Sequence, residues 1–235
     1  MYFRLPNKFL LCLLTITGAA LVGASAATIN PLNDGFEEAN LGGGFSAYQY
    51  SPPSTSWTYH SAAAVAGAGI AANGSVFGVT GATNGNYNGA TSTVGQAAFL
   101  QMGDGTLGQN GAYISQMISL AAGSYDLNFS LEGRLNYGAN GVNVFVNGVQ
   151  IGGTLFPANL GSFNDVNINL GNLAAGSYAI AFAGQGANGR DVTTFIDNIA
   201  IVSTVPDSGG TFMLMFCSGA ALFVIGGFAS RQSAK

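Results

Sequence analysis

Apolar and polar residues alternate along most of the second half of the chain. Within Ser124–Leu131, every second residue from Tyr125 onward carries a large apolar side chain. A period of two places such side chains on one face of a β-strand, and the chain between its two ends has no stretch with a convincing helical period of 3.6 residues. Alternation or short apolar runs predict further strands at Gln96–Met102, Tyr113–Leu120, Val142–Val146, Val149–Ile151, Val166–Leu170, Tyr178–Phe182 and Thr194–Val202. The predicted fold class is therefore all-β.

The turns between these strands carry their own signals. Asn147-Gly148 separates two short apolar runs and is typical of a two-residue hairpin. The segment Leu120–Tyr125, with the sequence LAAGSY, recurs at Leu173–Tyr178. Each copy predicts a tight Gly-Ser turn that delivers a tyrosine to the buried face at the start of a strand. Two such corners are what a sandwich of two sheets needs.

The first half of the chain has weaker strand signals. Phe45–His60 is rich in aromatic residues around Pro52-Pro53, and Ser61–Gly95 consists mostly of small and polar residues. For Ser61–Gly95 we expect short strands at best, and otherwise long loops.

Both ends of the chain are apolar. Arg4 and Lys8 precede an apolar run at residues 9–22, and Ala24-Ser25-Ala26 follows as a small-residue cleavage site, so residues 1–26 are predicted to be a secretory signal peptide. At the other end, the uncharged run 211–229 would span about 28 Å as a helix, which is close to the thickness of a bilayer core. We therefore expect one C-terminal transmembrane helix.

Both cysteines, Cys12 and Cys217, belong to these terminal segments. The predicted exported domain, residues 27–204, therefore has neither disulfides nor thiol chemistry. It carries nine acidic and two basic residues, a net charge of about −7. Such a surface repels phosphate backbones, so we expect no nucleic-acid partner.

The tail, residues 205–235, resembles the C-terminal sorting signals of the PEP-CTERM type, in their VPDSG variant. The motif is formed by Val205, Pro206, Asp207, Ser208 and Gly209. The resemblance implies recognition by an exosortase, a membrane-embedded processing enzyme, and a location at the cell surface or in the extracellular matrix after initial anchoring by the helix. The alternative is a plain single-span anchor that is not processed.

The domain itself resembles the galactose-binding-like jelly rolls, the fold of many carbohydrate-binding modules. The resemblance rests on Gly35-Phe36-Glu37, Ile114-Ser115-Gln116, Ala122–Tyr125 and Phe195–Ile199. It implies a two-sheet jelly-roll sandwich. It also implies a structural calcium ion that bridges Glu37 and Asp197, since calcium takes six to eight oxygen ligands. Alternatively, Glu37 caps a turn and Asp197 pairs with backbone amides.

Aromatic side chains and one arginine are candidates for a sugar site. Flat aromatic faces stack on pyranose rings, and a guanidinium can donate paired hydrogen bonds to hydroxyls or to a uronate. We select Trp57, Tyr59, Arg134 and Tyr137 as ligand-binding residues, from a wider set that includes Tyr48, Tyr50 and Tyr87. The alternatives are that Trp57 belongs to the core and that Arg134 pairs with Glu132 or Asp126.

Catalysis has little support in the sequence. His60 is the only histidine, and no phosphate-binding glycine loop is present. Paired carboxylates for glycoside hydrolysis are possible among the nine acids, but nothing places two of them on facing loops. We expect an exported, non-catalytic protein that binds or associates with extracellular polysaccharide. The alternatives are a structural or adhesive envelope component without a defined ligand and, third, a glycoside-active enzyme.

Overall fold

The computed structural model describes residues 28–29, 35–53, 56–62, 66–82, 86–87, 90–91, 95–186 and 191–204. The predicted signal peptide, sorting motif and transmembrane helix lie outside these residues. Within the described part of the chain, no helix is both long enough and apolar enough to cross a bilayer.

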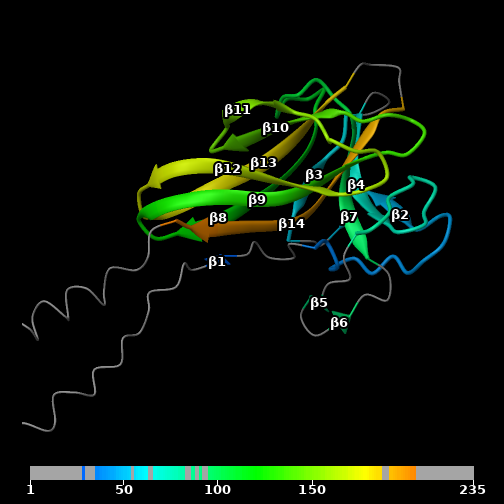
Figure 1. The fold of residues 1–235 in the computed structure, drawn as a ribbon, viewed down its shortest axis with the longest axis horizontal. Helices are drawn as coiled ribbons and strands as arrows, with labels where there is room; N and C mark the ends of the chain where they lie inside the picture. Colours follow the sequence, from blue (N-terminus) through cyan, green and yellow to red (C-terminus); the bar gives the residue numbers. More distant parts are fainter. Residues whose placement is uncertain are drawn as a thin grey trace, which may run out of the picture. The chain divides into compact units, whose positions relative to one another are not determined.

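Two antiparallel sheets form the fold (Figure 1). The first sheet has the order β12-β9-β14-β7-β4-β2, with β1 added beside β14, and the second has the order β11-β10-β13-β8-β3. The strands of the first sheet are β1 (Thr28–Ile29), β2 (Tyr48–Tyr50), β4 (Ala66–Ala72), β7 (Gln96–Met102), β9 (Gly123–Gly133), β12 (Asn164–Leu173) and β14 (Thr193–Ser203). Those of the second are β3 (Thr58–His60), β8 (Ala112–Leu120), β10 (Gly141–Val146), β11 (Val149–Leu155) and β13 (Gly176–Gln185), while β5 (Asn86–Tyr87) and β6 (Ala90–Thr91) pair separately.

The main core lies between the two sheets. The predicted alternation in β9 is confirmed, because Tyr125, Leu127, Phe129 and Leu131 are all at most 3% exposed and belong to this core. Ile114 in β8 and Phe182 in β13 face them from the second sheet. The all-β, two-sheet sandwich predicted from the sequence is therefore confirmed.

The repeated LAAGSY segments form equivalent corners, as predicted, but the turn is made by the two alanines and not by Gly-Ser. Gly123-Ser124 and Gly176-Ser177 are already the first residues of β9 and β13. The first corner carries the chain from β8 in the second sheet to β9 in the first, and the second carries it from β12 to β13 in the opposite direction. The Tyr125 hydroxyl donates to the Ala121 carbonyl over 3.0 Å, and the Tyr178 hydroxyl donates to the Ala174 carbonyl over 2.8 Å. Each tyrosine thus ties its own turn to the strand that follows.

The Asn147-Gly148 hairpin is also confirmed. Both residues have positive φ, 50° and 78°, as the tight turn between β10 and β11 requires.

The expectation for Ser61–Gly95 needs correction. Within it lies β4, a seven-residue strand buried along its whole length between β2 and β7. Its sequence, AGAGIAA, shows no clear alternation of apolar and polar side chains, because small residues occupy the face that points away from the main core. A Cβ atom on Gly69 would overlap the Gln49 carbonyl oxygen and the ring of Phe99, so larger side chains do not fit.

A second apolar cluster covers part of the outer face of the first sheet, over β4, β7 and β14. Strand residues Ala71, Ala97, Phe99 and Phe195 pack there against residues of the segment 73–82, which folds over the sheet. Phe77, Val79 and Ala82 supply the apolar contacts of that segment. This covered face positions the candidate site.

Candidate functional site

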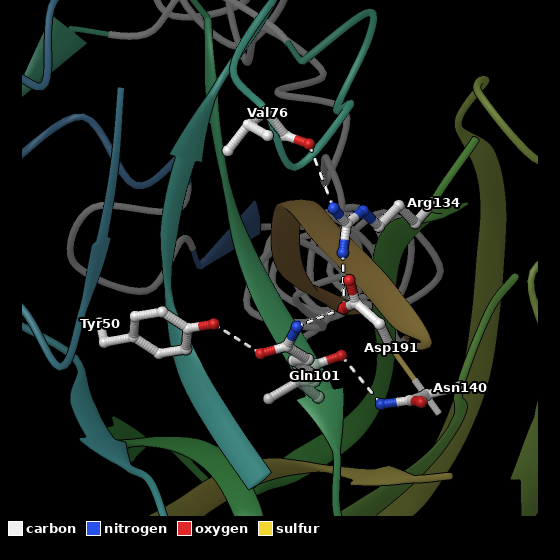
Figure 2. Close-up of polar contacts among 7 residues, drawn as sticks. Tyr50, Val76, Gln101, Arg134, Asn140 and Asp191 are labelled. Atoms are coloured by element: carbon white, nitrogen blue, oxygen red, sulfur yellow. Dashed lines mark hydrogen bonds and ion pairs between the residues drawn. The ribbon is translucent and has the colours of Figure 1, made fainter. Parts of the chain in front are cut away.

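Arg134 lies just after the end of β9, and neighbouring elements determine where its side chain points. Its backbone NH donates to the Thr193 carbonyl over 3.0 Å. Its guanidinium Nη1 lies 2.6 Å from Asp191 Oδ1, and Nη2 donates to the Val76 carbonyl over 3.1 Å (Figure 2). Of the alternatives raised by the sequence, pairing with Glu132 or Asp126 is therefore wrong. The arginine is bound instead to Asp191.

The guanidinium also contacts two aromatic rings. Arg134 Cζ lies 4.0 Å from the ring centroid of Tyr137 and 5.0 Å from that of Phe77. Phe77 is buried, whereas Tyr137 is 56% exposed. The exposed ring of Tyr137 is therefore supported by the guanidinium of Arg134, a residue that is only 4% exposed.

A chain of hydrogen bonds runs from Arg134 to a second tyrosine. Gln101 Nε2 donates to Asp191 Oδ1, the same oxygen that Arg134 contacts, and the Tyr50 hydroxyl donates to Gln101 Oε1. Figure 2 shows these residues side by side, with Gln101 and Asp191 between Tyr50 and Arg134. Burial, and then the charge of Asp191, raise the pKa of Tyr50, so its hydroxyl stays a hydrogen-bond donor.

Packing of its ring, as well as the hydrogen bond of its hydroxyl, fixes the position of Tyr50. Its ring lies against Gly67, where a Cβ atom would overlap Cε1 of the ring, and meets Phe99 edge-on at 5.0 Å. Tyr48 packs on Phe77 at 4.8 Å. Tyr48 and Tyr50 remain 37% and 42% exposed. We call Tyr48, Tyr50, Gln101, Tyr137 and Asp191 together the tyrosine surface.

Two of the four selected ligand residues lie elsewhere. Trp57 is 2% exposed and packs in the main core against Phe36 and Phe182, at 5.4 Å and 6.3 Å between ring centroids. The core alternative is therefore the right one for Trp57, because its indole has no face open to a sugar. Tyr59 is partly buried against the same core, and burial together with the charge of Glu38 raises its pKa well above the usual value. The side chain of Tyr87 lies outside the described residues.

Sequence reasoning selected Arg134 and Tyr137, and the structure brings them into contact. It missed Gln101 and Asp191, which join them to Tyr50. A polar residue at the end of an apolar strand, as Gln101 is in β7, was the available signal for one of the two. Nothing in the sequence around Asp191 indicates its distant partners.

The two predicted calcium ligands are neighbours. Glu37 is 4% and Asp197 is 0% exposed, and a Cβ atom on Gly35 would lie 3.8 Å from Asp197 Oδ1 and 3.9 Å from Glu37 Cγ. Each also accepts a backbone amide, from Gln96 to Glu37 and from Asn198 to Asp197. Within the described ranges, no three acids, histidines or cysteines are grouped for a metal. A calcium ion here would therefore take its remaining ligands from backbone carbonyls or water.

A further buried acid was not anticipated. Glu132 is 0% exposed and lies beneath the segment 73–82, where the Thr80 backbone NH and hydroxyl donate to its carboxylate over 3.0 Å and 3.1 Å. Burial raises its pKa to about 7, with a smaller contribution from the charge of Asp197 and opposition from the Thr80 bonds.

Comparisons with known proteins bear on the fold. Neither a protein-family model nor a curated protein sequence matches this chain. Among solved structures, a cyclase from Fischerella sp. TAU has a TM-score of 0.53 at 15% identity, covering 77% of this chain and 98% of its own. The Stig cyclase Fisc from the same source, in complex with an indole derivative, has a TM-score of 0.52 at 15% identity, with coverage of 78% and 100%.

Carbohydrate-binding modules are among the more distant likenesses. TmCBM61 in complex with β-1,4-galactotriose has a TM-score of 0.37 at 17% identity, covering 74% of this chain and 99% of that module. At these identities the comparisons establish a β-sandwich and no specific function, and the finer assignment to galactose-binding-like jelly rolls stays a prediction.

Proposed function

We propose that this chain is an exported, non-catalytic protein that binds extracellular polysaccharide through the tyrosine surface. The observation that carries the proposal is the chain of contacts that holds two half-exposed rings, Tyr50 and Tyr137, at its two ends. Each ring has one side supported, by Gly67 or by Arg134, while much of the ring remains exposed. An aromatic face presented in this way suits the apolar face of a sugar ring.

The polar residues between the rings suit a sugar as well. Gln101 and Asp191 offer amide and carboxylate groups to hydroxyls, and the side chain of Asp191 is 46% exposed. Because hydrogen bonds already fix these side chains, little conformational entropy is lost when a ligand binds.

A glycan array probed with the full chain, kept soluble in a detergent without a sugar headgroup, tests this proposal. We expect saturable binding that weakens at least tenfold in Tyr50→Ala and in Tyr137→Ala. Met117→Ala is the matched control, because Met117 is exposed on the second sheet and should not affect binding. The absence of any bound glycan favours the structural or adhesive alternative, and release of sugars from a polysaccharide favours the enzyme.

A structural calcium ion at Glu37 and Asp197 is the second part of the proposal. Its support is that both carboxylates are buried and that both side chains lie next to Gly35. Calcium would link the segment before β2 to β14. Its removal would weaken the contact between these two segments and leave the tyrosine surface unchanged.

The third part of the proposal is the location. The predicted signal peptide and helix 211–229 support export and initial membrane anchoring, and the motif at Val205–Gly209 supports processing by an exosortase. Fractionation of cells that express the full chain should find it in the envelope or the medium. Recovery in the cytosol would contradict this part.

A further inference from the structure

We propose that the tyrosine surface selects neutral glycans and rejects anionic ones, and that Asp191, not Arg134, is the charged group that the glycan meets. This inference rests on the proposed function and specifies its ligand class. The sequence alone leaves a uronate open as the partner of Arg134, and the contacts in the structure argue against it.

Arg134 is almost inaccessible to a ligand, since even its Nε, which has no hydrogen-bond partner, is buried. One terminal nitrogen contacts Asp191, the other donates to the Val76 carbonyl, and the guanidinium lies between the rings of Tyr137 and Phe77. Its side chain is 5% exposed. Arg134 is therefore a positioning residue, which fixes Asp191 on one side and Tyr137 on the other.

Asp191 is placed to receive hydroxyl donors. Its Oδ1 accepts from both Arg134 and Gln101, while Oδ2 takes part in neither bond. An exposed carboxylate accepts hydrogen bonds from sugar hydroxyls, and these bonds are stronger than those between neutral groups. The same carboxylate repels the carboxylate or sulfate of an anionic sugar.

The surrounding charges act in the same direction. Arg134 is the only lysine or arginine in the described part of the chain, and Asp191 already neutralises it. The exported domain has nine acids against two bases. The resulting net charge of about −7 repels an anionic polymer at long range, and salt screens this repulsion.

The test compares, on the array described above, pairs of glycans that share one backbone, where one member is neutral and the other is anionic. It includes methyl-esterified homogalacturonan with its de-esterified form, and cellohexaose with its C6-carboxylate form. We expect every bound glycan to be neutral and each anionic partner to bind at least tenfold more weakly. Equal or tighter binding of an anionic partner overturns the inference and leaves the proposed function intact. No binding to any glycan overturns both.

Asp191→Asn identifies the group responsible. It keeps the shape of the side chain and removes its charge, so the preference for the neutral member of a pair should fall at least tenfold. An unchanged preference overturns the role of Asp191.

If this variant does not fold, the salt dependence of glycan binding by the native protein tests the inference instead. Neutral glycans should bind equally well between 50 and 500 mM NaCl, whereas anionic binding that weakens with salt would indicate an accessible Arg134 and overturn the inference.

Discussion

Two oppositely charged residues are buried two positions apart, at the end of β9. Glu132 accepts hydrogen bonds from Thr80, and Arg134 donates to the Val76 carbonyl, so both hold the segment 73–82 against the first sheet. Arg134 is neutralised by Asp191, whereas burial raises the pKa of Glu132 to about 7. The two residues consequently have different effects on stability as pH changes.

Replacing Glu132 should change the pH dependence of stability. Its folded pKa of about 7 lies above the ordinary value of 4.5, so the folded state binds the proton more tightly than the unfolded state. The native protein should therefore lose stability as pH rises from about 4.5 to about 7, and Glu132→Gln should remove that loss. Thermal melts across this range, with a chelator present, measure the difference.

Asp165→Asn is the control for this measurement, because Asp165 is exposed on the same sheet. This variant should lose stability with rising pH as steeply as the native protein does. If stability falls equally steeply with pH in the native protein and in Glu132→Gln, Glu132 does not titrate in this range.

At the scale of elements, the two LAAGSY corners join the sheets in opposite directions. Both use the same bond, from a tyrosine hydroxyl to the carbonyl four residues earlier. They differ in burial, since Tyr125 is 3% exposed and the second bond is exposed to solvent. The corner at Tyr125 should therefore contribute more to stability than the corner at Tyr178.

Tyrosine-to-phenylalanine variants measure this contribution. Tyr125→Phe should lower the free energy of unfolding by about 1–1.5 kcal/mol, and Tyr178→Phe by about 0.5 kcal/mol, because only the hydroxyl bond is lost. Urea denaturation of each variant, with Tyr137→Phe as an exposed control, provides the values. A larger loss in Tyr178→Phe would contradict this order.

The strands differ in how far the sequence predicts them. Those with large side chains on one face, such as β9, follow directly from periodicity, and so does the hairpin at Asn147-Gly148. Strand β4 does not, because its outer face consists of glycine and alanine. Its glycines are needed because the rings of Tyr50 and Phe99 pack directly on them, and these rings come from other strands.

At the scale of the whole molecule, residues 27–204 contain no cysteine that could cross-link the two sheets. Its stability must come from the core between the sheets, the cluster on the outer face and, as proposed, a calcium ion at Glu37 and Asp197. An ion that binds only the folded state stabilises it by mass action, by about 2.7 kcal/mol at a concentration one hundred times the Kd.

Calcium should therefore raise the melting temperature, and a chelator should lower it. Asp197→Asn should make the two melting curves coincide, whereas Asp104→Asn, a change at an exposed acid, should leave the calcium effect in place. Differential scanning calorimetry measures both. Coinciding curves for the native protein would remove calcium from the proposal and leave the tyrosine surface unaffected.

The all-β class, most of the strands and the position of the two corners follow from the amino-acid sequence, because these features depend on residues close together in the chain. The candidate site, in contrast, depends on contacts between distant parts of the chain. Tyr50, Gln101, Arg134 and Asp191 come from four separate segments, and only sheet pairing and the packing of the 73–82 segment bring them together. Only packing, too, placed Trp57 in the core, since local sequence does not distinguish a buried indole from an exposed one.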